Sequence, residues 1–437
     1  MTPTTTPTTD VDPWTAGLDR YQRRRPNQTL VFGCAFLCSG PLPTRQEARA
    51  LANLVLDRLA RPGDGEPSVE RETARADRHL FEVTAPARSG EPGLRAALDD
   101  ISTHPLPDTG VGLWIVHGHA RGQFALVARV HHRLMDGVSG STMVDHIAAV
   151  LAGDQTPAPD APATAPPPPT PWHRTLRTPQ ATARAITALL TPAFAVPSAA
   201  RLQALPPRTA TTPQRHAWTR VPLERLRAAT THGRTSVNDV HLAALTGALR
   251  TWYTQRGHPL PADVVALIPV HIHRHHHTTV GNRFAATRAR LPVDEPDPRR
   301  RLSLIADRMR RVRRAFAHPC VETVLRVCPR AVIAWVMLRG FRPRSFTVMV
   351  TNVPGPARRL RPLGRVVDGV VPLNFLPADH VLSVVLMTYE DAACVSFTAH
   401  PDLDGIDDLP RLWAAALHDL LTPAPPAHTR PCRPADR

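Results

Sequence analysis

Hydrophobic and polar residues recur along this chain with two different periods, which together predict a mixed α/β protein. Between residues 44 and 60 the apolar positions follow a helical spacing of three to four residues, at Ala48, Leu51, Val55 and Leu59. Residues 112–120 and 123–132 instead have the composition of two strands that are joined by a short turn. The pattern therefore predicts a helix followed by a pair of adjacent strands.

The second of these strands has two distinct faces. Its alternation places on one face the residues Phe124, Leu126, Ala128 and Val130. The opposite face carries Ala125, Val127 and Arg129. A helix is expected next, with an apolar stripe formed by Val144, Ile147, Ala148 and Leu151.

A proline-rich segment divides the chain. Eight prolines fall between Pro157 and Pro171, so this stretch can be neither helix nor central strand. An amphipathic helical segment is expected at 178–203, and a second β/α alternation runs from 217 to 421. We predict two comparable α/β lobes with these parts: a disordered tail (1–12), an N-terminal lobe (13–152), a linker and crossover helix (153–215), a C-terminal lobe (216–424) and a proline-rich tail (425–437).

Residues 299–316 predict a strongly amphipathic helix. Its buried stripe is formed by Leu302, Ile305, Met309, Val312 and Phe316, and eight arginines occupy the other faces. Two interpretations of the arginines stay open: a solvated face, or attraction to the phosphates of a cofactor or to an anionic lipid surface.

The charge balance excludes two classes of enzyme. The chain has 53 basic and 37 acidic residues, a net charge of +16, and every basic residue is arginine. Without lysine there can be no P-loop lysine and no Schiff-base lysine for pyridoxal phosphate. The basic surface favours anionic partners, but no motif supports nucleic-acid binding.

The six cysteines are scattered, which indicates reduced thiols in a cytosolic protein. We see neither a signal peptide nor an apolar run of about 20 residues, so a cytoplasmic location is expected. Peripheral attachment to the inner membrane face or to lipid droplets stays open.

The segment HHRLMDGVSG, residues 131–140, is the strongest candidate for chemistry. Strand alternation sends His131 and His132 in opposite directions, so one can act while the other packs or hydrogen-bonds. Gly137 permits a turn, and a histidine held at such a corner suits a general base near neutral pH. A purely structural polar corner is the alternative.

Two other site types fit less well. A nucleophile elbow requires G-x-S-x-G, but residues 137–141 lack the final glycine. The histidine-rich stretch 271–277 places His271, His273 and His275 on one side of an extended segment. No cysteine or carboxylate is adjacent, so we expect a surface loop and no metal site.

The motif HHRLMDG resembles the HHxxxDG motif of acyl-CoA-dependent acyltransferases and of peptide-synthetase condensation domains. With the flanking FALVARVHH and GVSG, it resembles in particular the bacterial wax ester synthase/diacylglycerol acyltransferase (WS/DGAT) family. Further stretches similar to that family follow in the same order: residues 235–252, GNRF at 281–284, VMVTNVPGP at 348–356, and 382–402. The resemblance runs from about residue 30 to residue 421.

This resemblance implies a fold of two chloramphenicol-acetyltransferase-like lobes, each a mixed sheet with flanking helices, joined by a long crossover. It implies that His132 is the base, that Asp136 fixes the turn with Gly137 through an arginine ion pair, and that His131 packs. The implied reaction is O-acyl transfer from acyl-CoA, a co-substrate, to a lipophilic alcohol or diacylglycerol. It needs no covalent acyl-enzyme, no metal and no further cofactor.

Two further pairs are site candidates. Asn352 and Thr351 stand beside a rigid Pro-Gly-Pro turn and are candidate oxyanion donors. Asn238 and Asp239 open a helix behind Ser236, where helix capping is at least as good an explanation as catalysis. The segment 269–274 departs from the family pattern, which keeps open an enzyme that acylates a specialised metabolite, from CoA or from a carrier-protein thioester.

Overall fold

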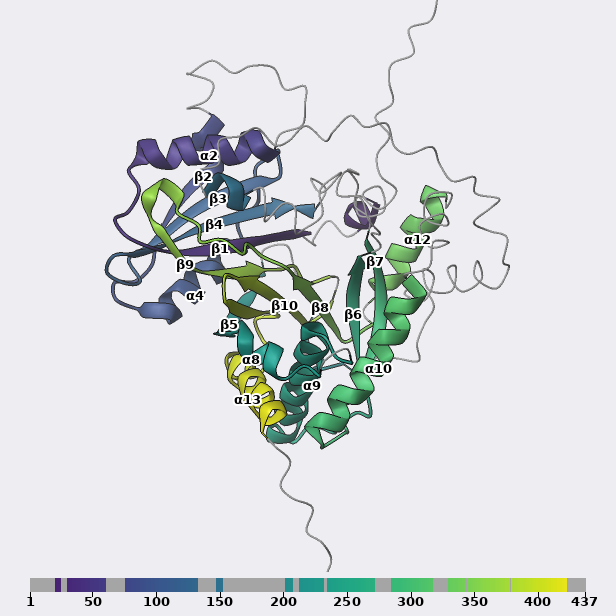
Figure 1. Cartoon of the computed structure of the whole chain (residues 1–437). Helices are drawn as coiled ribbons and strands as arrows, with labels where there is room; N and C mark the ends of the chain where they lie inside the picture. Colours follow the sequence, from purple (N-terminus) through teal and green to yellow (C-terminus); the bar gives the residue numbers. More distant parts are fainter. Residues whose placement is uncertain are drawn as a thin grey trace, which may run out of the picture.

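The computed structural model describes residues 20–24, 30–59, 75–132, 147–151, 201–206, 212–231, 234–271, 284–316, 329–342, 344–377 and 379–422. These residues form two mixed β-sheets with flanking helices (Figure 1). The predicted fold class, two lobes with a mixed sheet each, is confirmed.

The first sheet has the strand order β2-β3-β4-β1-β9. Its strands are β1 (Val31–Ser39), β2 (Leu80–Thr84), β3 (Val111–His117), β4 (Gln123–His131) and β9 (Val366–Leu373). Helices α2 (Arg45–Leu59) and α4 (Gly90–Ile101) cover its two faces.

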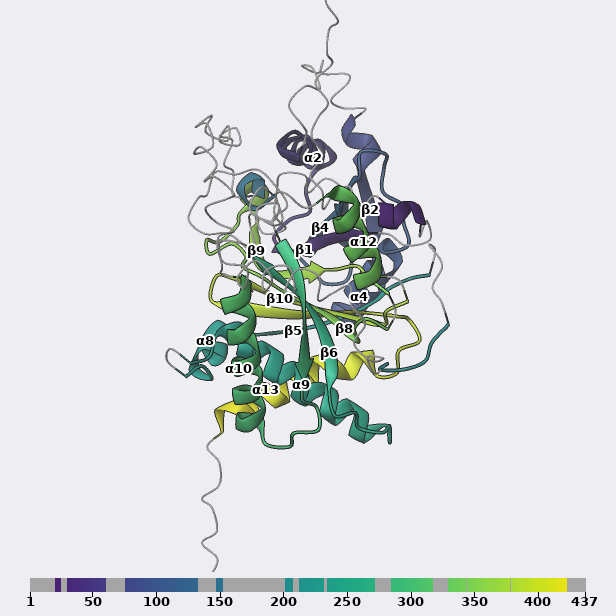
Figure 2. The same ribbon diagram turned by 90° about the vertical axis from the view of Figure 1, so that its right-hand side faces the viewer.

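The second sheet has the strand order β5-β11-β10-β8-β6-β7. Its strands are β5 (Arg215–Pro222), β6 (Val264–His271), β7 (Phe284–Leu291), β8 (Val348–Val353), β10 (Leu382–Tyr389) and β11 (Ala392–Ala399). The helices of this part are α8 (Leu223–Ala228), α9 (Val237–Gln255), α10 (Pro298–Phe316), α12 (Arg330–Gly340) and α13 (Leu409–Leu421), with short 3-10 turns at Pro362–Gly364 and Ile406–Asp408. Figure 2 shows α9 and α13 beneath the second sheet and α2 at the opposite end of the molecule.

The predicted periodicities hold wherever the structure describes the residues. One face of β4 packs in the apolar cluster under α2, through Phe124, Leu126, Ala128 and Val130. The other face packs in the cluster on the α4 side, through Ala125 and Val127. The predicted stripe of α2 is buried at Ala48, Leu51 and Val55. Ile147, Ala148 and Leu151 are buried on a helical segment at 147–151. The proline-rich segment and the helix expected at 178–203 lie outside the described residues, except for residues 201–203, which are not helical.

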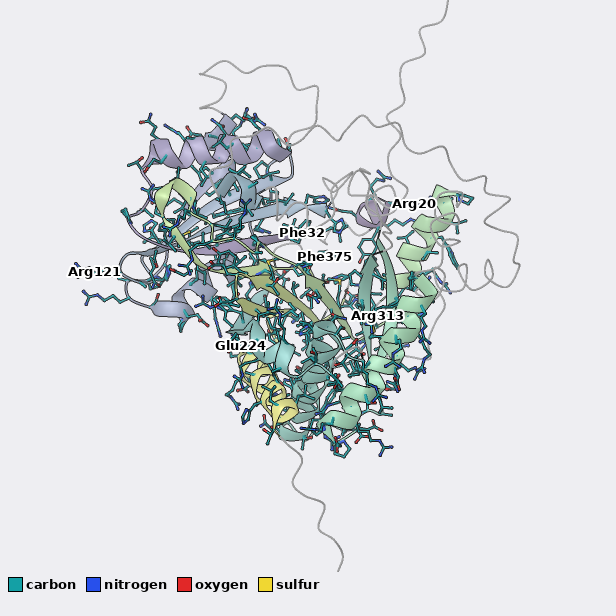
Figure 3. The ribbon with its side chains drawn as sticks, in the orientation of Figure 1. Arg20, Phe32, Arg121, Glu224, Arg313 and Phe375 are labelled. Atoms are coloured by element: carbon teal, nitrogen blue, oxygen red, sulfur yellow. The ribbon has the colours of Figure 1, made fainter. Side chains whose placement is uncertain are left out.

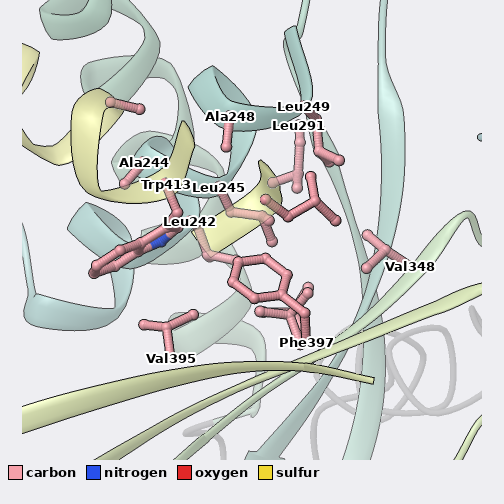
Figure 4. Packing of buried hydrophobic residues seen from close by; sticks show 14 of the residues in the cluster. Leu242, Ala244, Leu245, Ala248, Leu249, Leu291, Val348, Val395, Phe397 and Trp413 are labelled. Atoms are coloured by element: carbon pink, nitrogen blue, oxygen red, sulfur yellow. The ribbon is translucent and has the colours of Figure 1, made fainter. Parts of the chain in front are cut away.

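The core of the second lobe packs α9 and α13 against the second sheet. Figure 4 shows Leu245 and Trp413 from these helices close to Val395 and Phe397 of β11. Helix α10 adds Leu302, Ile305 and Met309 to the same cluster, with Val312 packed at its edge, as its periodicity predicts. Because α9 is buried over most of its circumference, it fixes the position of the sheet above it.

Strand β9 joins the two lobes. It lies late in the sequence, yet it pairs antiparallel with β1 at the edge of the first sheet. The chain then returns through Asn374 and Phe375 to β10 in the second sheet. Division of the sequence into consecutive lobes therefore does not describe the sheets completely, because one strand of the first sheet comes from the second half of the chain.

The two lobes share apolar clusters. Met387 and Tyr389 of β10 pack with β1, β4 and α2 of the first lobe. Tyr21 and Leu30 pack with Val265, Met349 and Phe375. We call the region where the second sheet faces the first lobe the seam. It is the place where residues from both halves of the sequence can meet one substrate.

Candidate active site

Backbone hydrogen bonds fix the end of β4 where the two histidines stand. The amide of His131 donates to the carbonyl of Gly110 at 2.8 Å, and that of His132 donates to Leu30 at 2.8 Å. Both neighbours of β4 in the sheet thus hold its last residues in place, which limits how far either imidazole can move.

His131 and the helical segment at 20–24 are linked by a side-chain hydrogen bond. Its Nε2 lies 2.6 Å from Oε1 of Gln22, and because an amide oxygen only accepts, the ring nitrogen donates. This contact accounts for one ring nitrogen and supports the packing role that the resemblance implies.

His132 stands between aromatic rings of both lobes. Its ring lies edge-on to Phe32 of β1 at 5.6 Å between centroids, and to Phe375 at 6.0 Å. Figure 3 shows Phe32 and Phe375 near each other where the lobes meet. The two histidines therefore contact different parts of the molecule: His131 faces the segment at 20–24, and His132 faces the seam.

Burial lowers the pKa of His132 to about 4, because an apolar environment disfavours the imidazolium. A hydrogen bond with its own backbone acts in the opposite direction, and the neighbouring His131 lowers the pKa further. At neutral pH the ring is uncharged and can accept a proton.

The rest of the motif lies outside the described residues. Asp136 and Gly137, and with them the predicted arginine partner of Asp136, stay predictions. The histidine-rich stretch lies outside them too, apart from the backbone of His271 at the end of β6. Within the described ranges, no three histidine, cysteine or acidic side chains are grouped as metal ligands would be.

The start of α9 is fully occupied by structural contacts. Ser236 caps the helix: its Oγ accepts from the amide of Asp239, whose Oδ2 accepts from the amide of Ser236. Arg313 of α10 donates to both carboxylate oxygens of Asp239, at 3.1 and 3.2 Å. Asp239 is completely buried. This arrangement favours the capping explanation for Asp239 over direct catalysis, and the role of Asn238 stays a prediction.

The pleat of β8 separates the two oxyanion candidates. Met349 and Val353 pack on the seam side, whereas Val348 and Val350 belong to the core of the second lobe. Because side chains alternate along a strand, Thr351 faces the seam and Asn352 faces the core side. Thr351 is thus the better placed of the two.

The turn after β8 requires its glycine. A Cβ on Gly355 would lie 2.0 Å from the carbonyl oxygen of Thr388, and the amide of Gly355 donates to Thr388 Oγ1 at 3.2 Å. The Pro-Gly-Pro turn therefore packs backbone against backbone, which fixes the end of β8.

A polar pair next to Phe375, the aromatic neighbour of His132, was not predicted from the sequence. Nδ2 of Asn374 donates to Oγ of Ser383 at 2.9 Å, and its Oδ1 accepts from the amide of Phe375 at 2.9 Å. Ser383 is completely buried. The available signal was a serine within the otherwise apolar run of β10, where a polar side chain needs a reason to be buried.

Most arginines of α10 have partners within the protein. Arg308 pairs with Asp263 at 3.1 Å and Arg310 with Asp307 at 2.9 Å, in addition to the Arg313 pair. Arg301 is buried and donates to the carbonyl of Glu295. These contacts favour the interpretation that the arginines of α10 form ion pairs within the protein or face solvent, and not that they bind phosphate.

Comparison with known proteins supports the resemblance along most of the chain. The family model for the wax ester synthase/diacylglycerol acyltransferase catalytic domain matches residues 65–241, and that for the WS/DGAT C-terminal domain matches residues 280–420. The chain belongs to the WS/DGAT family. As a WS/DGAT protein it is an enzyme of the acyl-CoA-dependent O-acyltransferase type.

A curated relative and two solved structures are similar to this WS/DGAT chain. A probable diacylglycerol O-acyltransferase of Mycobacterium tuberculosis is 24% identical over 408 residues, which cover 83% of this chain and 85% of that protein. The structure of the Marinobacter aquaeolei wax ester synthase/diacylglycerol acyltransferase has a TM-score of 0.63 at 20% identity, over 94% of this chain and 98% of that one. The first condensation domain of the CDA synthetase has a TM-score of 0.56 at 17% identity, over 95% and 97%. The structural likenesses show the shared fold.

None of the helices in the described ranges is long and apolar enough to cross a membrane. Three of the cysteines, Cys34, Cys38 and Cys394, are free thiols, as predicted. Burial raises the pKa of each to about 12, so they stay protonated and unreactive.

Proposed function

We propose that this WS/DGAT enzyme transfers an acyl group from acyl-CoA to the hydroxyl of a lipophilic alcohol or of diacylglycerol, with His132 as the general base. The observation that carries the proposal is the position of the His132 imidazole at the seam, between Phe32 and Phe375, where burial lowers its pKa. A thioester is already activated, so a positioned base suffices and no acyl-enzyme is needed.

In this mechanism, Nε2 of His132 takes the proton of the alcohol while its oxygen attacks the thioester carbonyl carbon. The tetrahedral intermediate carries a negative oxygen, which needs hydrogen-bond donors. Its collapse breaks the carbon–sulfur bond, and the departing CoA thiolate takes the proton back from His132. The ester and CoA leave, and the base returns to its neutral form.

The surroundings of His132 suit lipophilic substrates. The even-numbered face of β4, which His132 continues, runs from Val130 to Leu126 beneath α2. A cavity of about 30 Å³ on this face is lined almost entirely by apolar side chains, including Ala52, Ala128 and Leu151. An alkyl group that enters the first lobe under α2 would therefore meet apolar side chains, which favour its transfer from water.

The proposal is tested by following free CoA thiol with purified protein. Acyl-CoA is supplied with a long-chain alcohol, with diacylglycerol or with neither. We expect thiol release that depends on the alcohol, and a fall of about 10³-fold in kcat in His132→Ala, the size expected for the loss of a general base. His131→Ala is the matched control and should keep most of the activity.

Two results would contradict the proposal. Unchanged release in His132→Ala would exclude this residue as the base. Absence of release with every alcohol would shift support to the second enzyme hypothesis, acylation of a specialised metabolite, which is tested with carrier-protein thioesters. The same preparation can be mixed with lipid vesicles to test a peripheral location at a lipid surface.

A further inference from the structure

Ser383 has an unusual position for a polar side chain. It is completely buried on β10, between Leu382 and Val384 of the second lobe's core. Its only hydrogen bond within the described residues comes from Nδ2 of Asn374, at 2.9 Å. In that bond the serine oxygen accepts, so its own hydrogen remains to be donated.

No acceptor for this hydrogen lies within reach among the residues that the structure describes. A buried hydroxyl that makes only part of its hydrogen bonds costs free energy, and folded proteins keep few of them. The hydrogen of the Ser383 hydroxyl is therefore available to a ligand that reaches it.

The pleat of β10 directs this hydroxyl to the seam. Val384 and Leu386 belong to the core of the second lobe, whereas Met387 and Tyr389 pack toward the first lobe. Ser383 has the same parity as Met387, so it faces the first lobe. Asn374 fixes the serine oxygen in that direction.

Thr351 lies on the same face of the neighbouring strand. In the parallel pairing of β8 with β10, Ser383 stands opposite Met349, and Thr351 stands opposite Val385. The two hydroxyl residues are therefore diagonal neighbours, with about 8 Å expected between their Cα atoms from the strand spacing and rise.

Asn374 connects Ser383 to the surroundings of the base. Its Oδ1 accepts from the amide of Phe375, and the ring of Phe375 is edge-on to His132. The asparagine thus positions both the aromatic wall of the base and the serine hydroxyl. Movement of either one is limited by the same side chain.

We propose that Ser383 is a catalytic residue that donates a hydrogen bond to the thioester carbonyl oxygen as that oxygen becomes negative, and that Asn374 is the positioning residue for its hydroxyl. Thr351 supplies a second donor. This inference rests on the proposed function. When the alcohol oxygen bonds to the carbonyl carbon, the carbonyl π electrons move to the oxygen that Ser383 contacts, and they return when the thiolate leaves.

The experiment compares two reactions of the full-length enzyme: alcohol-dependent thiol release and the slower release with water as acceptor. Both pass through the same negative oxygen, whereas only the first needs a bound alcohol. We expect Ser383→Ala to lower kcat about 10²-fold in both reactions, with KM for acyl-CoA within about threefold, as for the loss of one oxyanion donor.

Three further variants separate catalysis from folding. Ser383→Cys keeps the shape with a weaker donor and should be nearly as slow as Ser383→Ala. Asn374→Ala should lower kcat about tenfold, and the double variant should be no slower than Ser383→Ala, since the two act together. Thr246 of α9 is the matched control: it is completely buried, its Oγ1 donates to the carbonyl of Leu242 at 2.6 Å, and Thr246→Val should retain wild-type kcat.

Each outcome distinguishes the two proposals. Wild-type kcat in both Ser383→Ala and Ser383→Cys would overturn the inference and leave the proposed function intact. A loss confined to the alcohol-dependent reaction would overturn it too, since Ser383 would then bind the alcohol. No acyl transfer by the wild-type enzyme to any alcohol would reject the proposed function, and the inference with it.

Discussion

Two polar clusters of this protein, both built on sequence motifs, differ in how completely they are satisfied. At the start of α9, Asp239 receives hydrogen bonds from Ser236 and from both ends of the Arg313 guanidinium. At the end of β4, His132 faces Phe32 and Phe375, and Asn374, the residue before Phe375, donates to Ser383. In the first cluster, the Asp239 carboxylate has hydrogen-bond donors for both of its oxygens. In the second, the Ser383 hydroxyl accepts a hydrogen bond but donates none among the described residues.

The difference teaches that burial alone does not mark a functional residue. Asp239 and Ser383 are both completely buried. A buried group whose bonds are complete stabilises the fold, and its loss costs stability. A buried group with incomplete bonds at a meeting point of two lobes is available to a substrate, and its loss should cost activity.

The largest expected effect is a loss of kcat when His132, at the end of β4, is replaced. His132→Ala should lower kcat about 10³-fold, because the reaction then lacks its general base. In the wild type, the acid limb of kcat/KM should fall near pH 4, well below the usual histidine range, because burial keeps the ring neutral down to its pKa of about 4. Initial rates of thiol release, measured on protein shown to be folded, would check the loss of kcat in the variant and the pH dependence of the wild type. An acid limb near pH 6.5 would contradict the burial argument.

The second effect is on stability. Asp239→Ala removes a helix cap and leaves Arg313 without its partner, which should lower the free energy of unfolding by about 2–3 kcal/mol. Since Arg313 is 44% exposed, the lower end of that range is expected. Urea unfolding would measure the loss, and kcat of the folded fraction should stay within about threefold.

A matched comparison is available on α10. Arg310 pairs with Asp307 on the exposed surface, and Arg310→Ala should change stability by about 0.5 kcal/mol or less. A loss of kcat in Asp239→Ala as large as that in His132→Ala would mean that Asp239 takes part in catalysis after all.

The third effect concerns acid stability through His241 of α9. This ring is fully buried against Trp413, and neither of its nitrogens has a partner among the described residues. Burial lowers its pKa to about 3. The unfolded chain binds the proton near pH 6.5, so stability is complete above that pH and falls as the pH drops toward 3, by about 1.4 kcal/mol per pH unit.

The variant His241→Leu removes this titration and should flatten the stability profile between pH 6 and 4. His132 titrates in the same direction, so the profile of His241→Leu should keep a residual slope. Urea midpoints at several pH values would measure the difference. Equal slopes in wild type and variant would show that His241 does not remain neutral in the fold.

The smallest effect is expected at His131. His131→Phe loses the hydrogen bond to Gln22 but keeps the ring volume, which should cost about 1 kcal/mol of stability and less than tenfold in kcat. Thermal unfolding would measure the change in stability, and the thiol-release assay would measure the change in kcat. A loss of kcat equal to that of His132→Ala would contradict the division of roles between the two histidines.

Local patterns in the sequence predicted many elements correctly. The two faces of β4, the stripe of α2 and the stripe of α10 follow from side-chain period, which depends only on neighbouring residues. The cap at Ser236 follows from a short motif for the same reason. His132 could be named because strand alternation and the motif resemblance agree on the corner that contains it.

Other features could not be predicted because they depend on pairing between distant segments. The place of β9 in the first sheet depends on its register with β1, more than 300 residues away. The preference for Thr351 over Asn352 depends on which face of β8 meets the first lobe. Neither fact has a local signature in the sequence.

The sequence by itself determined the family, the helices and strands with clear periods, and the histidine proposed as the base. The tertiary structure decided which polar groups are satisfied and which are left open at the seam. Phe375 lies near His132, and Asn374 contacts Ser383, only because β9 pairs in the first sheet and the chain then returns to β10 in the second. Hydrogen-bond satisfaction is a property of three-dimensional neighbours, and for this reason the second half of the site required the fold.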